Sequence, residues 1–516
     1  MARRFLAVSP WPGLIVAALV AFFSLGTLVA VALRAESFGA LDRFDLAAVR
    51  FTIVQAIWSA VLSVGLAVPV ARALARRSFW GRRALVTLLG APFILPVIVA
   101  ILGLTAVFGR SGIVAYGLSL AGLEPISIYG FHGVLLAHVF FNLPLATRLL
   151  LHGWGSVPAE QFRLASALDF APRDVFWHIE WPMLRSLVPG ILAIIFLICT
   201  TSFAVALTFG GGPDATTVEL AIYQAFKFDF NVGKAALLAG VQFAICGVAA
   251  LASLWFTLPQ AVTGGQDRVV HRFDTRGIAS TCLDTLWISV AALFLIVPLV
   301  AIFMQGAPSL MSLPQPVWSS ALRSLITALG SAGLSVVFAV SLALAALRWR
   351  WLEGLGMMSV AASPLVMGTG LFIMVFPFVD PATVALPVTA LVNAVMSLPF
   401  VLRSIAPAVR ASERRFGPLS DSLGMTGWAR FNLMILPRIR APLGFSAGLA
   451  AALSMGDLGV VTLFARPDGA TLPLQIYRLM GAYRMDQAMG AALLLLLVSL
   501  GLFYLFDRGG RGNVKL

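Results

Sequence analysis

Residues 164–185, LASALDFAPRDVFWHIEWPMLR, form a polar segment inside a strongly apolar chain. The segment holds three acidic side chains, two arginines and one histidine, and a Trp-Pro pair lies near its end. The whole chain of 516 residues, by contrast, is 60% hydrophobic and 11% charged, with a mean hydropathy of +0.95. The apolar runs therefore belong in a membrane, and the polar segment belongs outside it.

Long apolar runs recur along the whole chain. At a rise of about 1.5 Å per residue, roughly 20 residues cross a hydrocarbon core of about 30 Å. The sequence therefore predicts an all-α polytopic membrane protein with about twelve transmembrane helices. The expected spans are residues 13–33, 52–74, 84–108, 132–152, 186–209, 234–258, 284–304, 319–346, 355–378, 383–405, 440–464 and 487–507.

The placement of basic residues predicts the orientation. With the N-terminus inside, most of the 36 Lys and Arg residues fall in or beside cytoplasmic segments, as the positive-inside rule requires. An even number of helices then returns the C-terminus to the same side. The net charge of +14 reflects this topology and contact with the anionic lipid bilayer, and it calls for no nucleic acid partner. The three cysteines are typical of small packing residues and indicate no metal site.

The opening segment has a second copy. WHIEWPMLR (177–185) aligns with NLMILPRIR (432–440), so that Pro182 meets Pro437, 255 residues further on. Other matches follow in the same order along the chain. They are NLP (142–144) with SLP (397–399), SAVLSV (59–64) with SAGLSV (331–336), and the PD…T…IY segments at 213–223 and 467–477.

This ordered series predicts a tandem duplication. The expected parts are a first half at residues 1–258, a polar cytoplasmic linker at 259–283 and a second half at 284–516, giving two parallel six-helix repeats. Each long polar insertion follows the fourth helix of its half and lies on the cytoplasmic side. Two equivalent projections favour a two-fold-symmetric partner beneath them.

Each insertion is predicted to be a helix-turn-helix. Apolar residues recur at roughly helical spacing in both copies, and Pro158 and Pro418 are typical of first helical turns. Turn-permissive residues then interrupt the pattern at 169–172 and at 424–427. The alternative for a single copy is an amphipathic helix packed on lipid headgroups, which two copies in register make less favourable.

These insertions resemble the EAA loops of bacterial ABC importer permeases, whose pattern contains a glycine and ends in Ile-x-Leu-Pro. The second copy matches at Gly424, Leu436 and Pro437, and the first matches at Ile179 and Pro182. Asp169 stands at the glycine position of the first copy, and neither copy keeps the whole Glu-Ala-Ala start.

Over nearly its full length the chain resembles the fused, type I ABC permeases of thiamine and thiamine-pyrophosphate importers. The matching segments are HVFFNLPLATRLLL (138–151), FGGGPDATTVELAIYQAF (209–226), SMGDLGVVTLF (454–464), LPLQIYRLMGAYR (472–484) and GNVK (512–515). Fused ferric-iron permeases share the repeat and are the nearest alternative.

The resemblance implies a partner set. The chain has no G-x-x-x-x-G-K-[ST] phosphate loop, so ATP hydrolysis is expected on a separate homodimer of ABC ATPase subunits and no cofactor is expected in this chain. A periplasmic substrate-binding protein would deliver the solute, and the location would be the bacterial inner membrane. The residues expected in the ATPase-coupling loops are Ala165, Leu168, Asp169, Phe170, Ala171, Pro172, Pro182, Leu423, Gly424, Met425, Thr426, Gly427 and Pro437.

Two further groups of residues are candidates for function. Asp457 is the most conspicuous charge within an apolar run, and its repeat mate Ser202 is neutral; both are assigned to the translocation pathway, although Asp457 could instead hold a helix pair together. The paired outer segments offer Asp214, Tyr223, Asp468 and Tyr477 as docking residues for the binding protein. Their alternative is a packing role that closes the outer mouth.

Secondary transporters of the major-facilitator type also have twelve helices in two parallel halves. They lack long polar insertions after the fourth and tenth helices, so this alternative is less favoured. A membrane-embedded enzyme fits less well still, because no catalytic motif is found.

Overall fold

The computed structural model describes residues 9–35, 41–90, 94–210, 212, 215–253, 277–357, 363–466 and 469–511, and throughout these ranges the regular structure is helical. The N-terminal part contains α1 (Trp11–Ala21), η1 (Phe22–Gly26), α2 (Thr27–Arg34), α3 (Arg43–Arg76), α4 (Arg82–Leu88), α5 (Val97–Phe108), α6 (Ile113–Leu120), α7 (Phe131–Ser156), α8 (Ala159–Ala167), α9 (Pro172–Val175), η4 (Phe176–Glu180), α10 (Trp181–Thr200), α11 (Phe203–Phe209), α12 (Val218–Lys227) and α13 (Val232–Ser253). The C-terminal part contains α14 (Ile278–Leu310), α15 (Gln315–Ala346), α16 (Trp351–Met357), α17 (Pro364–Val375), α18 (Ala385–Ser422), α19 (Gly427–Arg430), η8 (Phe431–Ile435), α20 (Leu436–Met455), α21 (Gly459–Phe464), α22 (Leu472–Gly481) and α23 (Met485–Arg511).

Eleven helices among the described residues are long and apolar enough to cross a membrane, which confirms the polytopic all-α class. The ninth predicted span, 355–378, is wrong in length: its described residues form the end of α16 and the 12-residue α17, which is too short to count as a span. The third lies further along than predicted, at Val97–Leu120. Both differences arise at prolines, because a proline nitrogen cannot bond within a helix and favours a helix start. Pro96 precedes α5, and Pro364 opens α17.

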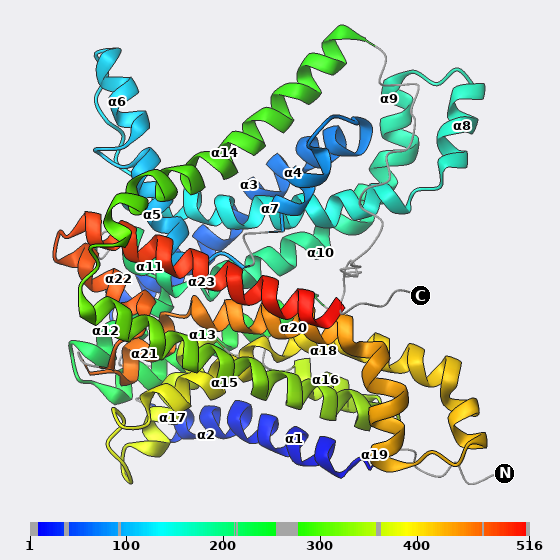
Figure 1. The fold of residues 1–516 in the computed structure, drawn as a ribbon. Helices are drawn as coiled ribbons and strands as arrows, with labels where there is room; N and C mark the ends of the chain where they lie inside the picture. The colour runs from blue at the N-terminus through cyan, green and yellow to red at the C-terminus, as the bar shows by residue number, and fades with distance from the viewer. Residues whose placement is uncertain are drawn as a thin grey trace.

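The elements from α3 to α13 recur in the same order from α15 to α23, except that α6 has no helical counterpart and that α18 covers the positions of both α7 and α8 (Figure 1). Even a hydrogen bond is repeated. The hydroxyl of Thr52 on α3 accepts from the backbone N–H of Val218 at 2.9 Å, and that of Ser324 on α15 accepts from Leu472 at 2.8 Å. The short helices α12 and α22 thus rest their N-terminal ends on equivalent long helices. The predicted linker at 259–283 falls outside the described residues as far as 276, and α14 begins at Ile278.

The first helix of each half packs on the other half. α1 lies along α15, where a side chain on Gly13 would meet the Ala345 Cβ at 2.3 Å, so the glycine permits the close approach. α14 lies along α3 and α5. Near its start, Asp284 accepts from Arg76 at 2.5 Å and from Arg77 at 2.8 Å in a buried cluster. The two halves are therefore interlocked.

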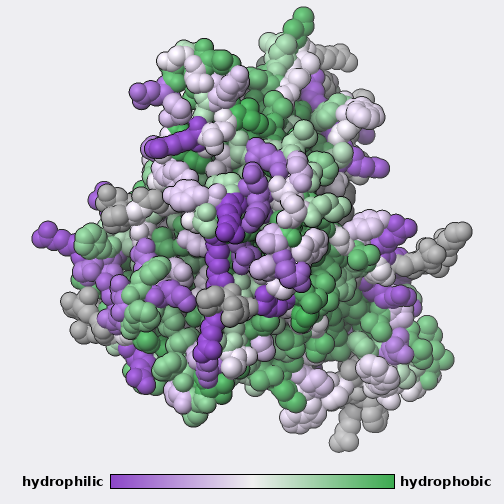
Figure 2. Space-filling view, turned by 60° about the vertical axis from the view of Figure 1, so that its left-hand side comes forward, coloured by the Kyte–Doolittle hydropathy of each residue, from purple (hydrophilic) through white to green (hydrophobic). Residues whose placement is uncertain are grey.

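The two polar insertions project at the same end of the molecule, where α1 begins and α23 ends (Figure 1). We call them hairpin 1 (residues 159–180) and hairpin 2 (residues 413–435). Hydrophobic residues cover broad areas of the surface, while hydrophilic residues gather in patches (Figure 2). This surface suits a protein whose long helices face lipid and whose ends face water.

The two hairpins are entered differently. α7 stops at Ser156 and α8 follows Pro158, whereas α18 runs unbroken from Ala385 to Ser422. The prediction that Pro418 opens a helix is therefore wrong, since this proline lies inside α18. The residue matching Pro158 is Glu413, whose backbone N–H lets the helix continue, and Pro418 removes only one bond close to the helix end.

Candidate functional site

Both hairpins turn through the same backbone hydrogen bonds. In hairpin 1 the N–H of Phe170 donates to the Ala165 carbonyl at 3.0 Å, and in hairpin 2 the N–H of Met425 donates to Ser420 at 2.9 Å. The preceding residues complete the motif, with Asp169 donating to Ser166 and Gly424 donating to Asp421. This pattern is a Schellman motif, which ends a helix by using its last free carbonyls.

The Schellman motif explains the aspartate that replaces glycine in hairpin 1. Its turn residue must adopt a left-handed backbone, and φ is +51° at Asp169 and +63° at Gly424. Glycine does this without steric cost, and aspartate is among the few other residues that tolerate it. The two turns are therefore equivalent although their residues differ.

The tips of the hairpins expose large apolar side chains. Leu168 is 59% exposed and Leu423 is 66% exposed, and Trp428 beside the second turn is 74% exposed. Of the other residues predicted to contact an ATPase, Ala171 and Pro172 are exposed and Ala165 is buried within hairpin 1. These exposed side chains at the two tips offer apolar contact area to a partner protein.

A π-helical turn precedes the repeated proline in both copies. The N–H of Trp181 donates to Phe176, five residues back, and the N–H of Leu436 donates to Phe431 in the same way. The wider turn makes room for the ring of Pro182 or Pro437, which would otherwise press on the carbonyl four residues earlier. Each hairpin can thus continue directly into a membrane helix, α10 or α20.

Hairpin 1 has an apolar interior and a polar anchor. Phe162, Ala165 and Val175 form its small buried cluster. At its base, fully buried Glu180 accepts from Arg72 at 2.6 Å and from the Trp154 indole at 3.0 Å, so that the hairpin is tied to α3 and α7.

Hairpin 2 has the opposite arrangement. Its interior holds Arg430, which donates to both carboxylate oxygens of Glu413 at 2.6 and 3.1 Å and also pairs with Asp421. At its base, Ile435 occupies the position of Glu180 and Val409 occupies that of Trp154; both are fully buried in the main apolar cluster. The charge and the apolar packing have exchanged places between the copies.

The two predicted pathway residues occupy equivalent places. Ser202 lies directly before α11, and Asp457 lies between α20 and α21. The Asp457 Oδ1 accepts from the N–H of Gly459 at 3.1 Å, which supports a structural role for this oxygen, while its Oδ2 is buried and has no partner.

Of the four predicted docking residues, the structure describes Tyr223 and Tyr477. Tyr223 is 9% exposed and Tyr477 is half-buried, and each lies on one of the short helices α12 and α22. Burial raises the pKa of both phenols. Asp214 and Asp468 lie outside the described residues. The burial of Tyr223 leaves little of this side chain for a partner protein to touch and favours the alternative packing role.

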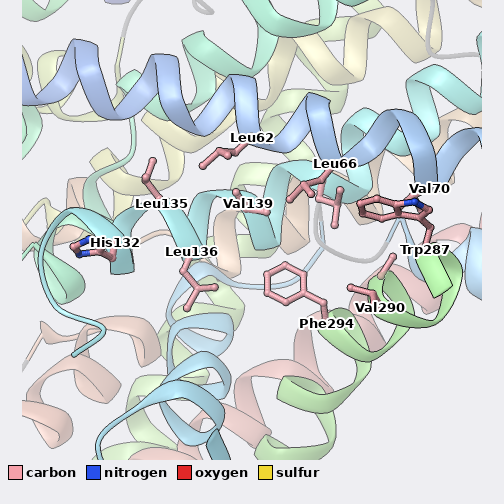
Figure 3. A pocket seen from close by; sticks show the side chains of 12 residues that line it. Leu62, Leu66, Val70, His132, Leu135, Leu136, Val139, Trp287, Val290 and Phe294 are labelled. Atoms are coloured by element: carbon pink, nitrogen blue, oxygen red, sulfur yellow. The ribbon is translucent and has the colours of Figure 1, made fainter. Parts of the chain in front are cut away.

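A cleft of about 420 Å³ lies between α3, α7 and α14 (Figure 3). Its lining is apolar apart from His132 at one end and the Trp287 indole, and Leu62, Leu66 and Val290 are partly open to the surroundings. Such a lining suits hydrocarbon and offers no place for a polar solute.

Two matched hairpins at one end of a duplicated helical membrane bundle define the class. The chain is the permease subunit of an ABC importer, with both halves on one polypeptide, and it is a multi-pass inner-membrane protein. No family model matches it. The thiamine transport system permease protein ThiP of Salmonella typhimurium is 39% identical over 529 residues, with 98% of each chain covered.

The ThiP protein of Escherichia coli is 38% identical over 481 residues, which covers 90% of this chain and 89% of the relative. A probable sulfate transport system permease protein of Helicosporidium is 30% identical over 174 residues, or 34% of this chain and 62% of the relative. The chain therefore belongs to the family of thiamine transport system permease proteins.

Sequence reasoning missed several residues that the structure brings together. Arg430, Glu413 and Glu180 were not predicted, because the repeat holds Val175, Pro158 and Ile435 at the matching positions and so gives no sign of a shared ion pair. Glu219 was not predicted either, although a carboxylate on the same helical face as Tyr223 and Phe226 was a usable signal.

Proposed function

We propose that this chain imports thiamine and its phosphates, and that ATP hydrolysis by a separate ABC ATPase homodimer, which binds hairpins 1 and 2, drives this import. The relatives named above supply the substrate class. A periplasmic binding protein would deliver the solute at the opposite end. Both termini would be cytoplasmic, because the hairpins, the start of α1 and the end of α23 share one end of the molecule.

One observation carries the coupling role. Two hairpins that are 255 residues apart share a left-handed turn, a Schellman motif and an exposed leucine at the tip, at the same end of the protein. A two-fold-symmetric ATPase dimer needs two such equivalent contact surfaces on the permease. Its closure would pull on both hairpins, and α10 and α20 would pass this movement to the membrane part.

The test replaces both tip leucines with charge. In the Leu168→Glu/Leu423→Glu variant, we expect normal insertion, because both side chains are exposed, but loss of ATPase co-purification and of ATP-dependent thiamine uptake. The matched control is Leu164→Glu/Leu419→Glu, which changes two leucines of similar exposure one turn earlier. Wild-type uptake and co-purification in the tip variant would contradict the coupling role.

The ferric-iron alternative makes a different prediction. In the ranges that the structure describes, no three His, Cys, Asp or Glu side chains lie together as a metal site would require. Uptake assays with labelled thiamine and with ferric iron, each supplied with its binding protein, separate the two substrates directly.

A further inference from the structure

Aromatic rings from both halves meet along one seam. Phe226 of α12 lies 4.4 Å from Phe372 of α17, measured between ring centroids, and Phe372 lies 5.5 Å from Phe464 of α21. On the first half's side, Phe203 of α11 lies 5.4 Å from Tyr223. We call this place the aromatic seam (residues 203, 223, 226, 372 and 464). It is closed in this structure, because the rings contact one another across it.

A buried acid lies at one edge of the aromatic seam. Glu219, Tyr223 and Phe226 follow one face of α12 at the spacing i, i+4, i+7. Glu219 is fully buried, and neither of its carboxylate oxygens has a hydrogen-bond partner. Its neighbours include Ser363 at the start of α17 and Gln242 of α13, whose own side-chain oxygen is also buried and unpartnered.

The two Glu219 carboxyl oxygens and the Gln242 side-chain oxygen are buried in the same place without a hydrogen bond of good geometry, which is an unfavourable arrangement. A buried polar atom without a partner is costly, and native structures keep few of them. What this edge lacks is a positive charge. Burial raises the pKa of Glu219 to about 8, so in the closed seam the carboxyl holds a proton at neutral pH.

A second acid adjoins the aromatic seam from the other half. A side chain placed on Gly459 would lie 3.7 Å from the Asp457 Oδ1 and 3.8 Å from the Phe203 ring, so the acid and the ring are neighbours of the same glycine. The free Oδ2 of Asp457 is buried. Each half thus supplies one carboxylate with unused hydrogen-bonding capacity, and both supply rings.

We propose that the aromatic seam is the passage for a flat organic cation, recognised by the rings and by Glu219 and Asp457. Rings attract cations over their faces, and carboxylates in a low dielectric attract them more strongly still. A cation arriving beside Glu219 would favour its ionised form. The assignment rests on the proposed function, because thiamine carries a cationic thiazolium and an aminopyrimidine with N–H donors.

Glu219→Gln separates recognition from packing. The amide has the shape of the protonated acid present in the closed seam, so a purely structural Glu219 predicts wild-type behaviour. We expect instead that ATP-dependent thiamine uptake by the complete reconstituted transporter falls about ten-fold or more, with Glu219→Gln/Asp457→Asn lower still. ATPase stimulation by loaded binding protein should persist, because the hairpins are untouched.

Two matched controls accompany these variants. Asp229→Asn removes an exposed acid just after α12, and Phe140→Leu truncates a buried ring of α7 away from the aromatic seam. Phe226→Leu, the seam counterpart of the second control, should reduce uptake while Phe140→Leu reduces it much less.

Uptake within two-fold of wild type in Glu219→Gln/Asp457→Asn would overturn the proposal. If the Glu219→Gln variant does not assemble, the Asp457→Asn and Phe226→Leu variants test the proposal instead. Normal thiamine uptake in both of them would overturn it. The failure of the proposed function looks different: the wild-type transporter itself would show no ATP-dependent thiamine uptake.

Discussion

Hairpin 1 and hairpin 2 have the same backbone conformation at the turn, but the positions of their buried charges and apolar side chains are reversed. Hairpin 1 is closed by Phe162 and Val175 and anchored by Glu180, whereas hairpin 2 is closed by Arg430 and anchored by Ile435. A buried charge and its partner were exchanged together for apolar residues at both places. The comparison teaches that the unit kept by the duplication is the packed group and its turn, and single residues are replaceable when their partners change with them.

The largest expected effect comes from placing one residue of hairpin 2 in hairpin 1. Val175→Arg buries a charge without the partners that it has in hairpin 2, because Pro158 and Ser166 stand at the positions of Glu413 and Asp421, and this should destabilise hairpin 1 by about 3 to 5 kcal/mol. Limited proteolysis of membranes should cut this hairpin quickly, and thiamine uptake should be lost. Adding Phe162→Gly, Pro158→Glu and Ser166→Asp, the remaining residues of the hairpin 2 arrangement, should restore resistance. If Val175→Arg alone stays resistant, the packed groups are not the unit of exchange.

The anchors provide a smaller test. Glu180→Ile leaves the Arg72 guanidinium and the Trp154 indole without their acceptor, at a cost of about 2 to 3 kcal/mol. Adding Arg72→Leu, the residue at the matching position 344 of the second half, should recover more than half of the lost thermal stability of the purified protein. A double variant less stable than the single one would contradict the exchange.

The turns should show the smallest effects, and the same residue should have the same effect in both copies. Gly424→Val forces a branched residue into a left-handed backbone and should cost about 1 to 2 kcal/mol, with reduced uptake. Asp169→Gly should be neutral within about 0.5 kcal/mol, because the turn already has the backbone that glycine prefers. Thermal unfolding and uptake measure both. Asp169→Val is the matched control and should behave like Gly424→Val.

The differences between the hairpins show which structural features can be predicted from the sequence. The hydropathy of the spans, the repeated prolines and the turn residues at 169 and 424 predicted the helical membrane bundle and both hairpins, because these features are local. Local patterns do not say which neighbour a side chain meets. The partners of Arg430 and Glu180 lie 9 to 108 residues away, so their ion pairs could not be read from motifs.

The same limit applies to the aromatic seam. The helical spacing of Glu219, Tyr223 and Phe226 is visible in the sequence, but their facing rings belong to α17 and α21 in the other half. Asp457 was noticed because a charge in an apolar run is conspicuous. Its position beside Phe203 depends on how the two halves close on each other, which only the structure supplies.

The packing of the first helix of each half on the other half also affects the order of folding during synthesis. α1 is synthesised well before α15, on which it packs and which is completed 325 residues later. At about 5 to 20 residues per second, α1 waits roughly 15 to 60 s for its partner. During that interval the face that includes Gly13 has only lipid or a chaperone to cover it. The first half can therefore reach its final packing only after the ribosome has finished much of the second.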